Sequence, residues 1–138
     1  MKKFILLLSV ITLTLNSCSS DDDNTTVQAE DSFIGIWTQS KSVFEGNDQP
    51  LDDCDRQSSF TINLDGTFTE SSYFTNSAGI CELDFSDPGT WENLGNNTYK
   101  LKYNADEDGD QYEENITITD NVFVVSYDDP YFYYFSKN

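Results

Sequence analysis

The amino-acid sequence predicts an all-β protein whose strands form an antiparallel up-and-down barrel, and three observations support this fold class. From Phe33 onward apolar and polar residues alternate, and Thr, Tyr, Phe and Val are frequent. Turn-forming residues recur roughly every 8–12 positions, as they do between short antiparallel strands. No stretch has the period of an amphipathic helix. Without crossover helices the strands can form a sandwich or a barrel, and consecutive hairpins favour a barrel because closure removes exposed edges.

Nine segments have the strand pattern. They are residues 33–44, 57–63, 67–75, 79–85, 89–94, 98–103, 112–119, 122–127 and 131–136. Segment 98–103 is the clearest, because its aromatic and aliphatic residues alternate strictly with threonine and lysine. Such alternation is expected of a strand with one face in a core and the other in water.

The loop at residues 64–66 predicts a hairpin with a defined register. A two-residue turn would place Ile62 and Phe68 on opposite faces, whereas a three-residue loop sets them opposite each other on one apolar face. The longer loop also places Gly66 at a left-handed position, where glycine has no steric penalty. We therefore expect the three-residue, bulged hairpin, since register follows the pairing that buries the apolar residues.

A second hairpin is predicted at residues 120–121. A two-residue turn there aligns Ile118 with Phe123 and Ile116 with Val125, so that the apolar side chains share one face.

The first 17 residues have the features of a removable signal peptide. Lys2 and Lys3 precede a short apolar run, Phe4 to Leu15, that is too short for a transmembrane helix of roughly 20 residues. The segment Leu15-Asn16-Ser17-Cys18 resembles the lipobox of bacterial lipoproteins. The resemblance implies cleavage before Cys18 and attachment of diacylglycerol and further acyl chains, such as palmitate, to Cys18, which would anchor the protein to a membrane. The alternative is an ordinary secretory signal followed by an incidental cysteine.

Residues 18–32 are predicted to be a flexible tether that carries the lipidated cysteine. The segment is polar and acidic and contains nothing that could form a core. Its run Ser19-Ser20-Asp21-Asp22-Asp23 resembles the acidic export signal of Bacteroidetes lipoproteins. That resemblance implies a lipid anchor in the outer membrane with the protein facing the cell exterior; a plain solvated linker is the alternative.

The cysteine count predicts one disulfide. If Cys18 is lipidated, Cys54 and Cys81 are left, and in an oxidising compartment these two should pair. The closed loop would restrict the unfolded chain by about 3–4 kcal/mol on the chain-entropy model. Two buried free thiols are the alternative.

The net charge excludes one class of partner. The chain has 25 Asp and Glu against 7 Lys and Arg, a formal charge of −18. Nucleic acid is therefore excluded, because a phosphate backbone is bound by clustered cations. Such acidity suits a basic partner protein, or simply keeps a monomer soluble.

Gly35-Ile36-Trp37 resembles the G-x-W signature of lipocalins, and the wider pattern is similar to the small lipocalin-like domains of Bacteroidetes lipoproteins. The parts of that pattern are Ile34-Gly35-x-Trp37, Cys54, Ser59-Phe60, Asp65-Gly66-Thr67-Phe68, Cys81, Gly89-Thr90-Trp91, Gly95-Asn96 and Tyr134-Phe135-Ser136-Lys137. The resemblance implies an eight-stranded barrel over residues 33–138, closed at one end by Gly35 and Trp37, with Lys137 a candidate to stack on Trp37. With eight strands, the two segments within residues 79–94 would be one bent strand.

Aromatic residues are dense enough to suggest a binding site in the barrel mouth. The candidates are Phe74, Tyr99, Tyr103, Phe123, Tyr127 and Tyr133, with Tyr131 and Phe135 beside them. The alternative is that these side chains simply form the core, since small barrels are filled by their own side chains.

Catalysis is not predicted. The chain has no histidine, which removes Ser-His-Asp and Cys-His nucleophiles and the commonest zinc ligands. The segment 104–110 matches the first half of a calcium loop, with oxygen ligands at Asn104, Asp106, Asp108 and Asp110 and a glycine in between. Because position 12 is Asn115 rather than glutamate, the expectation is at most a weak calcium site, or else an acidic solvated loop. No cofactor other than the acyl chains is expected.

Three functions are consistent with these features. The first is a non-enzymatic module that binds a small apolar or amphipathic ligand. The second is an accessory subunit of an envelope complex, and the third is an inhibitor that binds a basic host enzyme. The sequence names no ligand.

Overall fold

The structure is a computed structural model that describes residues 31–105, 109–127 and 129–137. Nine strands and one short 3-10 helix are formed by these residues. The strands are β1 (Gly35–Phe44), β2 (Asn47–Gln49), β3 (Ser59–Ile62), β4 (Thr67–Thr75), β5 (Cys81–Gly95), β6 (Thr98–Tyr103), β7 (Glu113–Thr117), β8 (Val122–Val125) and β9 (Tyr131–Lys137), and the 3-10 helix η1 is Asp55–Gln57. No helix in the described part of the chain is long and apolar enough to cross a membrane.

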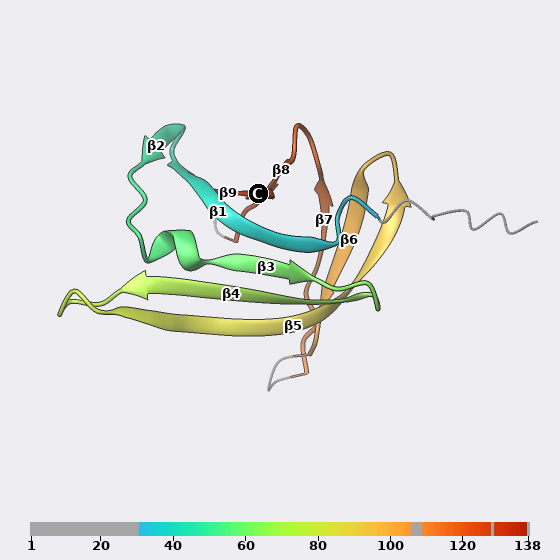
Figure 1. Cartoon of the computed structure of the whole chain (residues 1–138), viewed down its shortest axis with the longest axis horizontal. Coiled ribbons are helices and arrows are strands. Elements are labelled where there is room, and N and C mark those ends of the chain that lie inside the picture. The colour runs from blue at the N-terminus through green and yellow to red at the C-terminus, as the bar shows by residue number, and fades with distance from the viewer. Residues whose placement is uncertain (1–30, 106–108, 128, 138) are drawn as a thin grey trace, which may run out of the picture.

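Eight of the strands form one antiparallel, nearly closed barrel. Their order is β7-β6-β5-β4-β3-β1-β9-β8, so that consecutive barrel strands pair except for β7 and β8, which lie at the two ends of this order, and β1 also pairs with β9. The predicted all-β up-and-down barrel is therefore confirmed. In Figure 1, β4 and β5 form a long hairpin along one side of the molecule, and β6 and β7 run at a steep angle to that hairpin.

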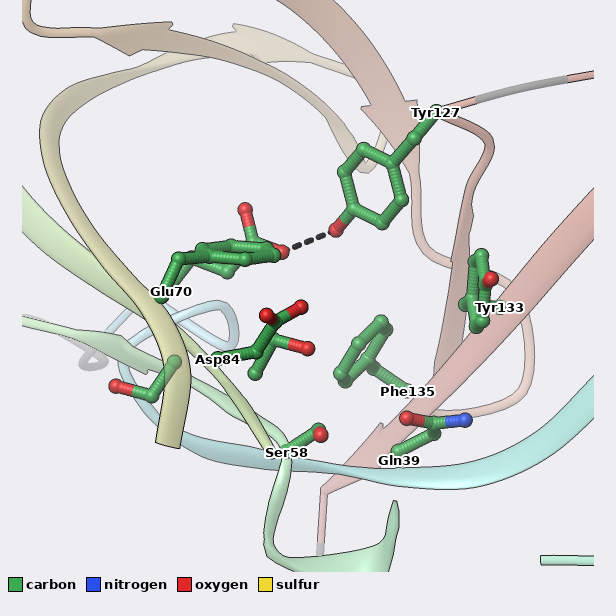
Figure 2. Close-up of a pocket in the computed structure, with 10 residues that line it drawn as sticks. Gln39, Ser58, Glu70, Asp84, Tyr127, Tyr133 and Phe135 are labelled. Carbon is green, nitrogen blue, oxygen red and sulfur yellow. Dashed lines mark hydrogen bonds between the residues drawn. The ribbon is translucent and has the colours of Figure 1, made fainter. Parts of the chain in front are cut away.

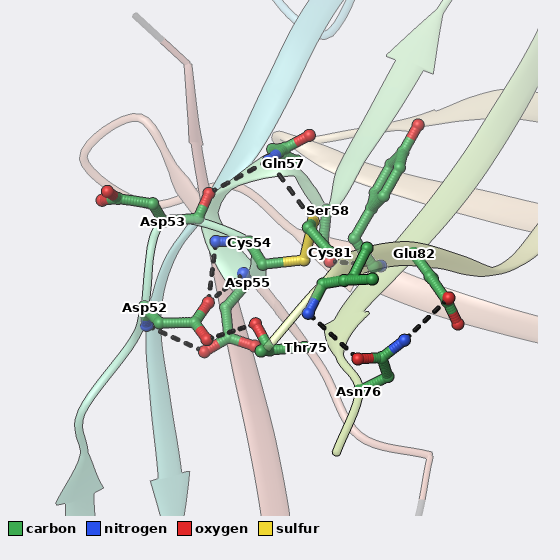
Figure 3. The surroundings of a disulfide bond; sticks show 12 residues. Asp52, Asp53, Cys54, Asp55, Gln57, Ser58, Thr75, Asn76, Cys81 and Glu82 are labelled. Carbon is green, nitrogen blue, oxygen red and sulfur yellow. Dashed lines mark hydrogen bonds between the residues drawn. A yellow bond between two sulfur atoms is a disulfide. The ribbon is translucent and has the colours of Figure 1, made fainter. Parts of the chain in front are cut away.

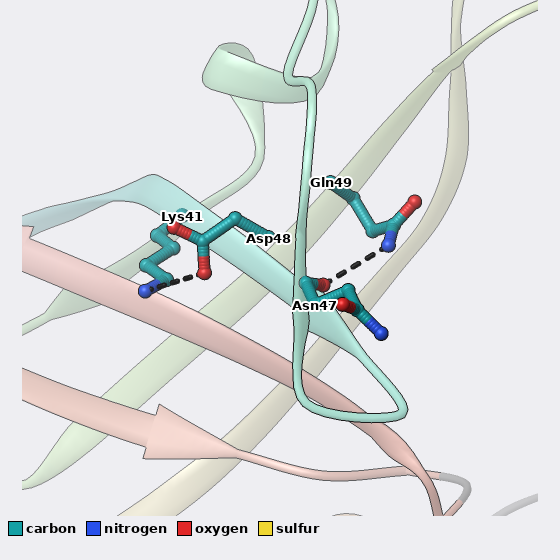
Figure 4. Close-up of polar contacts among 4 residues, drawn as sticks. All are labelled: Lys41, Asn47, Asp48 and Gln49. Carbon is teal, nitrogen blue, oxygen red and sulfur yellow. Dashed lines mark hydrogen bonds and ion pairs between the residues drawn. The ribbon is translucent and has the colours of Figure 1, made fainter.

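The strand β2 is separate from the barrel and pairs only with the end of β1. Lys41 on β1 forms an ion pair with Asp48 on β2 at 2.7 Å, and the amide of Gln49 donates to the carbonyl oxygen of Asn47 (Figure 4). Both charged side chains are exposed, so the ion pair contributes little to the stability of the hairpin.

The two hairpin predictions have different outcomes. Ile62 pairs with Phe68, both are buried, and Gly66 has a φ of 85°, so the bulged register is confirmed. At residues 120–121 both central residues have positive φ, which is a two-residue turn, and Thr119 bridges Val122.

Beyond that bridge the predicted pairing of Ile116 with Val125 is wrong. The described ladders place β7 beside β6 and β8 beside β9, and the barrel remains open between β7 and β8. Ile116 and Val125 are both buried all the same, because they reach the core from the two sides of this opening.

Residues 81–95 form one strand, β5, rather than two segments. Pro88 is tolerated because it lies at the end of the ladder to β6, where its carbonyl oxygen accepts from the N–H of Asn104 and its missing N–H removes only one terminal hydrogen bond. A Cβ on Gly89 would lie 2.5 Å from both the Lys102 carbonyl oxygen and the Phe68 ring, so only glycine permits this close approach. The single bent strand implied by the lipocalin resemblance is thus present.

A disulfide between Cys54 and Cys81 fixes the loop before β3 to the start of β5, as the cysteine count predicts (Figure 3). The Asp52 carboxylate holds the same loop: it accepts hydrogen bonds from the backbone N–H groups of Cys54 and Asp55 and from the hydroxyl of Thr75. The long β4–β5 hairpin is therefore tied to the barrel at its far end.

The core is an interlocked set of aromatic and aliphatic side chains inside the barrel. Its members are Phe33, Trp37, Phe60, Ile62, Phe68, Tyr99, Leu101, Tyr103, Ile116, Phe123, Val125 and Phe135. On β6 the alternation predicted from the sequence is confirmed, since Tyr99, Leu101 and Tyr103 are buried and the lysines between them are not. Burial of each such side chain contributes roughly 1.5–3 kcal/mol.

Candidate functional site

One end of the barrel is closed by Trp37. Its ring is fully buried, and its indole N–H donates to the carbonyl oxygen of Phe33 at 2.7 Å. The ammonium group of Lys137 lies 6.0 Å from the centre of the Trp37 ring and donates to the carbonyl oxygens of Ser32 and Ile34. Gly35 has a φ of 133°, and a Cβ there would lie 2.8 Å from Lys137 Cε, so the glycine makes room for the lysine.

Asp31 completes this end and was assigned to the tether by sequence reasoning. Its carboxylate accepts hydrogen bonds from the N–H of Phe33 at 2.9 Å, the hydroxyl of Tyr99 at 2.7 Å and the amide of Asn93 at 2.6 Å. Partial burial opposes ionisation, but these hydrogen bonds outweigh it and lower the pKa of Asp31. Asp31, in the segment predicted to be a tether, is therefore held against the barrel.

The opposite end of the barrel contains a cavity. Along β1 the inward side chain after Trp37 is Gln39, and along β6 the inward side chains run from Tyr99 to Tyr103, so these strands lead from the closed end to the mouth. The cavity has a volume of about 380 Å³. It is lined by Gln39, Ser58, Glu70, Ser71, Ser72, Asp84, Phe85, Tyr127, Tyr133 and Phe135, whose labelled members converge on one space in Figure 2.

A second cavity of about 260 Å³ adjoins the first. The two share Glu70, Phe85 and Tyr127 as walls. Its other lining residues are Asp87, Tyr103, Asn104, Asp110 and Tyr112. The mouth is thus a two-part hollow with Glu70 between the parts.

Glu70 is the most unusual residue of the mouth, because it is an acid that is only 2% exposed. It accepts hydrogen bonds from the hydroxyl of Tyr103 at 2.8 Å and from the hydroxyl of Tyr127. Burial raises the pKa of Glu70 to about 7, even though the two hydrogen bonds act in the other direction. The carboxyl group therefore changes its charge close to neutral pH.

A second carboxyl group competes for the same phenol. The Tyr103 hydroxyl lies 3.1 Å from Glu114 Oε1 as well as 2.8 Å from Glu70 Oε2. Burial raises the pKa of Glu114 too. Since a hydroxyl has one proton to donate, it cannot fully satisfy two ionised carboxylates at once. A proton on one of the carboxyl groups resolves the competition.

The charges around the mouth have one sign. Glu70, Asp84, Asp87 and Asp110 line the two cavities, and no lysine or arginine of the described chain does so. Walls of one charge with few cations nearby produce a negative potential in the hollow.

A sequence model of the family described as Lipocalin-like domain matches residues 33–125. The chain belongs to the lipocalin-like domain family. The match covers the barrel from the closed end through β8, in agreement with the nearly closed eight-stranded architecture. No curated protein and no solved structure matches the chain.

The lipocalin-like barrel brings together only part of the predicted aromatic site. Tyr127 and Tyr133 line the larger cavity, and Tyr103 and Tyr127 line the smaller one. Tyr99 and Phe123 are instead buried in the core near Phe33 and line neither of these two cavities.

Phe74 and Tyr131 also lie elsewhere. Phe74 is 41% exposed on the β4–β5 hairpin and lines neither cavity, and Tyr131 stacks on Phe44. Phe135 does line the larger cavity. The residue that sequence reasoning missed is Glu70. Its signal is an acid two positions after Phe68, in phase with the inward face of β4.

The predicted lipidation and calcium sites fall largely outside the described residues. Cys18 lies outside them, as do Asp106 and Asp108, while Asn104 and Asp110 line the smaller cavity. The described residues contain no group of three or more Cys, Asp or Glu arranged to hold a metal ion. The weak calcium site therefore stays a prediction.

Proposed function

We propose that this protein is a lipid-anchored binding module of the outer membrane, facing the cell exterior, whose barrel mouth holds a small apolar or amphipathic molecule without converting it. The observation that carries the proposal is the cavity of about 380 Å³ at the mouth of a lipocalin-like barrel. Small-molecule sites in proteins are typically concave, about 300–1,000 Å³, and mostly apolar with a few placed polar groups.

Part of the lining suits the apolar body of such a ligand. Phe85, Tyr127, Tyr133 and Phe135 supply aromatic surface, and Gln39 adds a polar group near the floor. Tyr127 is 42% exposed, so the cavity is accessible from solvent on its side. Aromatic faces bury a large area at small conformational cost and favour an organic ligand over water.

Binding can be tested by native mass spectrometry of the protein purified from its own host. We expect a small molecule to be retained, or added probes such as octanol and octylamine to bind in a one-to-one complex. Ser72→Phe places a ring in the cavity and should abolish the complex. Ser77→Phe makes the same change at an exposed loop position outside both cavities and should leave binding intact. Loss of binding in neither variant, or no complex in the wild type, would contradict the proposal.

The anchor rests on the lipobox resemblance at Cys18 and is tested separately. Labelled palmitate should enter the wild-type protein and be absent from Cys18→Ser. Protease added to intact cells should degrade the wild-type protein if it faces the exterior. Protection from protease until the outer membrane is opened would place it on the inner side instead.

A further inference from the structure

The charges of the mouth restrict the class of ligand that it can hold. Carboxylates of Glu70, Asp84 and Asp87 surround the hollow, and no described cation shares it. A ligand with a carboxylate or phosphate group would enter a negative potential with no positive partner. Fatty acids and other anionic amphiphiles are therefore disfavoured, because an uncompensated charge in a poorly solvated site is costly.

A neutral apolar ligand is also poorly matched to this lining. It would cover Asp84 and Asp87 and remove water from them without offering a counter-charge. The described ion pairs place Lys41 beside Asp48 and the lysines of β6 beside Glu113, so Glu70 has no cationic partner of its own among them. Lys137 is engaged at the opposite end of the barrel.

Aromatic side chains of the cavity supply a second element of a cation site, beside the carboxylate of Glu70. The rings of Tyr127 and Tyr133 lie 5.6 Å apart between centroids and are inclined by 41°, and both line the cavity that Glu70 lines (Figure 2). The face of a phenol ring attracts an ammonium group within about 6 Å. Phe85 and Phe135 complete the lining with apolar surface suited to a hydrocarbon body.

We infer that the mouth of this barrel selects a molecule that carries a protonated amine on an apolar body, with the ammonium group paired to Glu70 and facing Tyr127 and Tyr133. This inference rests on the proposed function, since it names the ligand class of the same cavity. Ligand binding also relieves the competition for the Tyr103 hydroxyl. An ammonium group on Glu70 leaves that hydroxyl to donate to Glu114, which lies 3.1 Å away. The raised pKa of Glu70 agrees with a carboxyl group that lacks its cation.

The test compares three probes of equal chain length by isothermal titration calorimetry at about pH 8, where Glu70 is ionised and an alkylamine is still protonated. The probes are octylamine, octanol and octanoate. We expect octylamine to bind on the order of tenfold or more tighter than octanol, and octanoate not to bind detectably, because a hydrogen-bonded charge pair contributes about that factor.

Variants assign the preference to Glu70. Glu70→Gln keeps the size of the side chain and should weaken octylamine binding on the order of ten- to hundredfold while leaving octanol binding within about twofold. Asp84→Asn, at the exposed rim, should have a smaller effect in the same direction. Glu92→Gln removes one negative charge from an exposed position of β5 that lines neither cavity, and it should not change either affinity.

The outcomes separate the two proposals. Binding of octanol or octanoate as tightly as octylamine would leave the barrel a binding module but overturn the amine preference. An unchanged octylamine affinity in Glu70→Gln, or an equal loss in Glu92→Gln, would overturn the role of Glu70. If none of the three probes binds, the mouth is not a small-molecule site and both proposals fail.

Discussion

The two ends of this barrel differ in how completely their polar side chains are hydrogen-bonded. At the closed end, Lys137 donates to backbone carbonyl oxygens, and the Asp31 carboxylate accepts three hydrogen bonds from separate donors. At the mouth, Glu70 and Glu114 share the single hydroxyl proton of Tyr103. The closed end is satisfied by its own chain, whereas the mouth has more acceptors than donors.

The pKa shifts follow this difference. Hydrogen bonds lower the pKa of Asp31 despite partial burial, while burial raises the pKa of Glu70 to about 7 despite its hydrogen bonds. The ionised form of Asp31 therefore stabilises the folded state, whereas the ionised form of Glu70 destabilises it. A polar group whose hydrogen bonds are all made within the fold stabilises the fold. A carboxylate that lacks hydrogen-bond donors within the fold is available to bind a ligand.

The largest expected effect is on the closed end. Trp37→Ala removes a fully buried ring that contacts Phe33 and Phe123, and it should lower the free energy of unfolding by about 3–5 kcal/mol in urea denaturation. Tyr127→Ala, at the mouth, removes a ring that is 42% exposed and should lower it by only about 1–2 kcal/mol. Equal losses at the two ends would contradict the comparison.

The next effect is a pH dependence that originates at the mouth. The pKa of Glu70 is about 7 in the folded protein against 4.5 for an ordinary glutamate, so the folded state binds more protons between these values. Stability should therefore fall as pH rises from about 4.5 to about 7, by up to about 3 kcal/mol. Glu70→Gln should remove most of this fall and make the protein more stable than the wild type at about pH 8. Urea denaturation across this range measures both, and a parallel pH profile in the variant would show that Glu70 is not the cause.

A smaller effect isolates the packing of Lys137 over the first strand. Gly35→Ala should lower the free energy of unfolding by about 1–2 kcal/mol, because it combines an unfavourable φ with a contact to Lys137 Cε. Gly79→Ala is a control for a positive φ alone, since no atom lies near its added Cβ. In a Lys137→Ala background Gly35→Ala should cost less than it does in the wild type, because only the unfavourable φ remains, whereas the cost of Gly79→Ala should not change. If the cost of Gly35→Ala is the same in both backgrounds, the lysine does not press on the glycine.

The sequence was sufficient to predict the barrel because each strand carries its own pattern. Alternation identified the inward face of β6, and the hairpin at Gly66 could be placed in register by asking which pairing buries Ile62 and Phe68. The predicted pairing of Ile116 with Val125 is wrong because it depends on more than local pattern. Local turn chemistry fixes the turn at residues 120–121, but whether two strands stay together beyond it depends on how far the whole sheet closes.

The candidate site was only half predictable. Aromatic residues were identified as a class, yet depth along the barrel axis decides whether one fills the core, as Tyr99 does, or lines the mouth, as Tyr133 does. Glu70 was missed because the chain contains 25 acids, and only the phase of β4 marks this one as inward. Its partners Tyr103 and Tyr127 come from segments more than 30 residues away, so no local pattern links them.

The smallest expected effect tests the sign of the contrast between the two ends. Asp31 has a lowered pKa in the folded protein, so its ionisation contributes stability above its ordinary pKa of 3.8 that is lost as pH falls through the folded value. Asp31→Asn should therefore lower the free energy of unfolding by on the order of 1 kcal/mol at about pH 7, and by much less at about pH 3. Asp120→Asn, at an exposed turn where asparagine adopts positive φ readily, should be neutral at both pH values. This dependence runs opposite to that of Glu70, where loss of the charge is stabilising at high pH. A stabilising Asp31→Asn at about pH 7 would mean that the closed end, like the mouth, leaves its carboxylate short of donors.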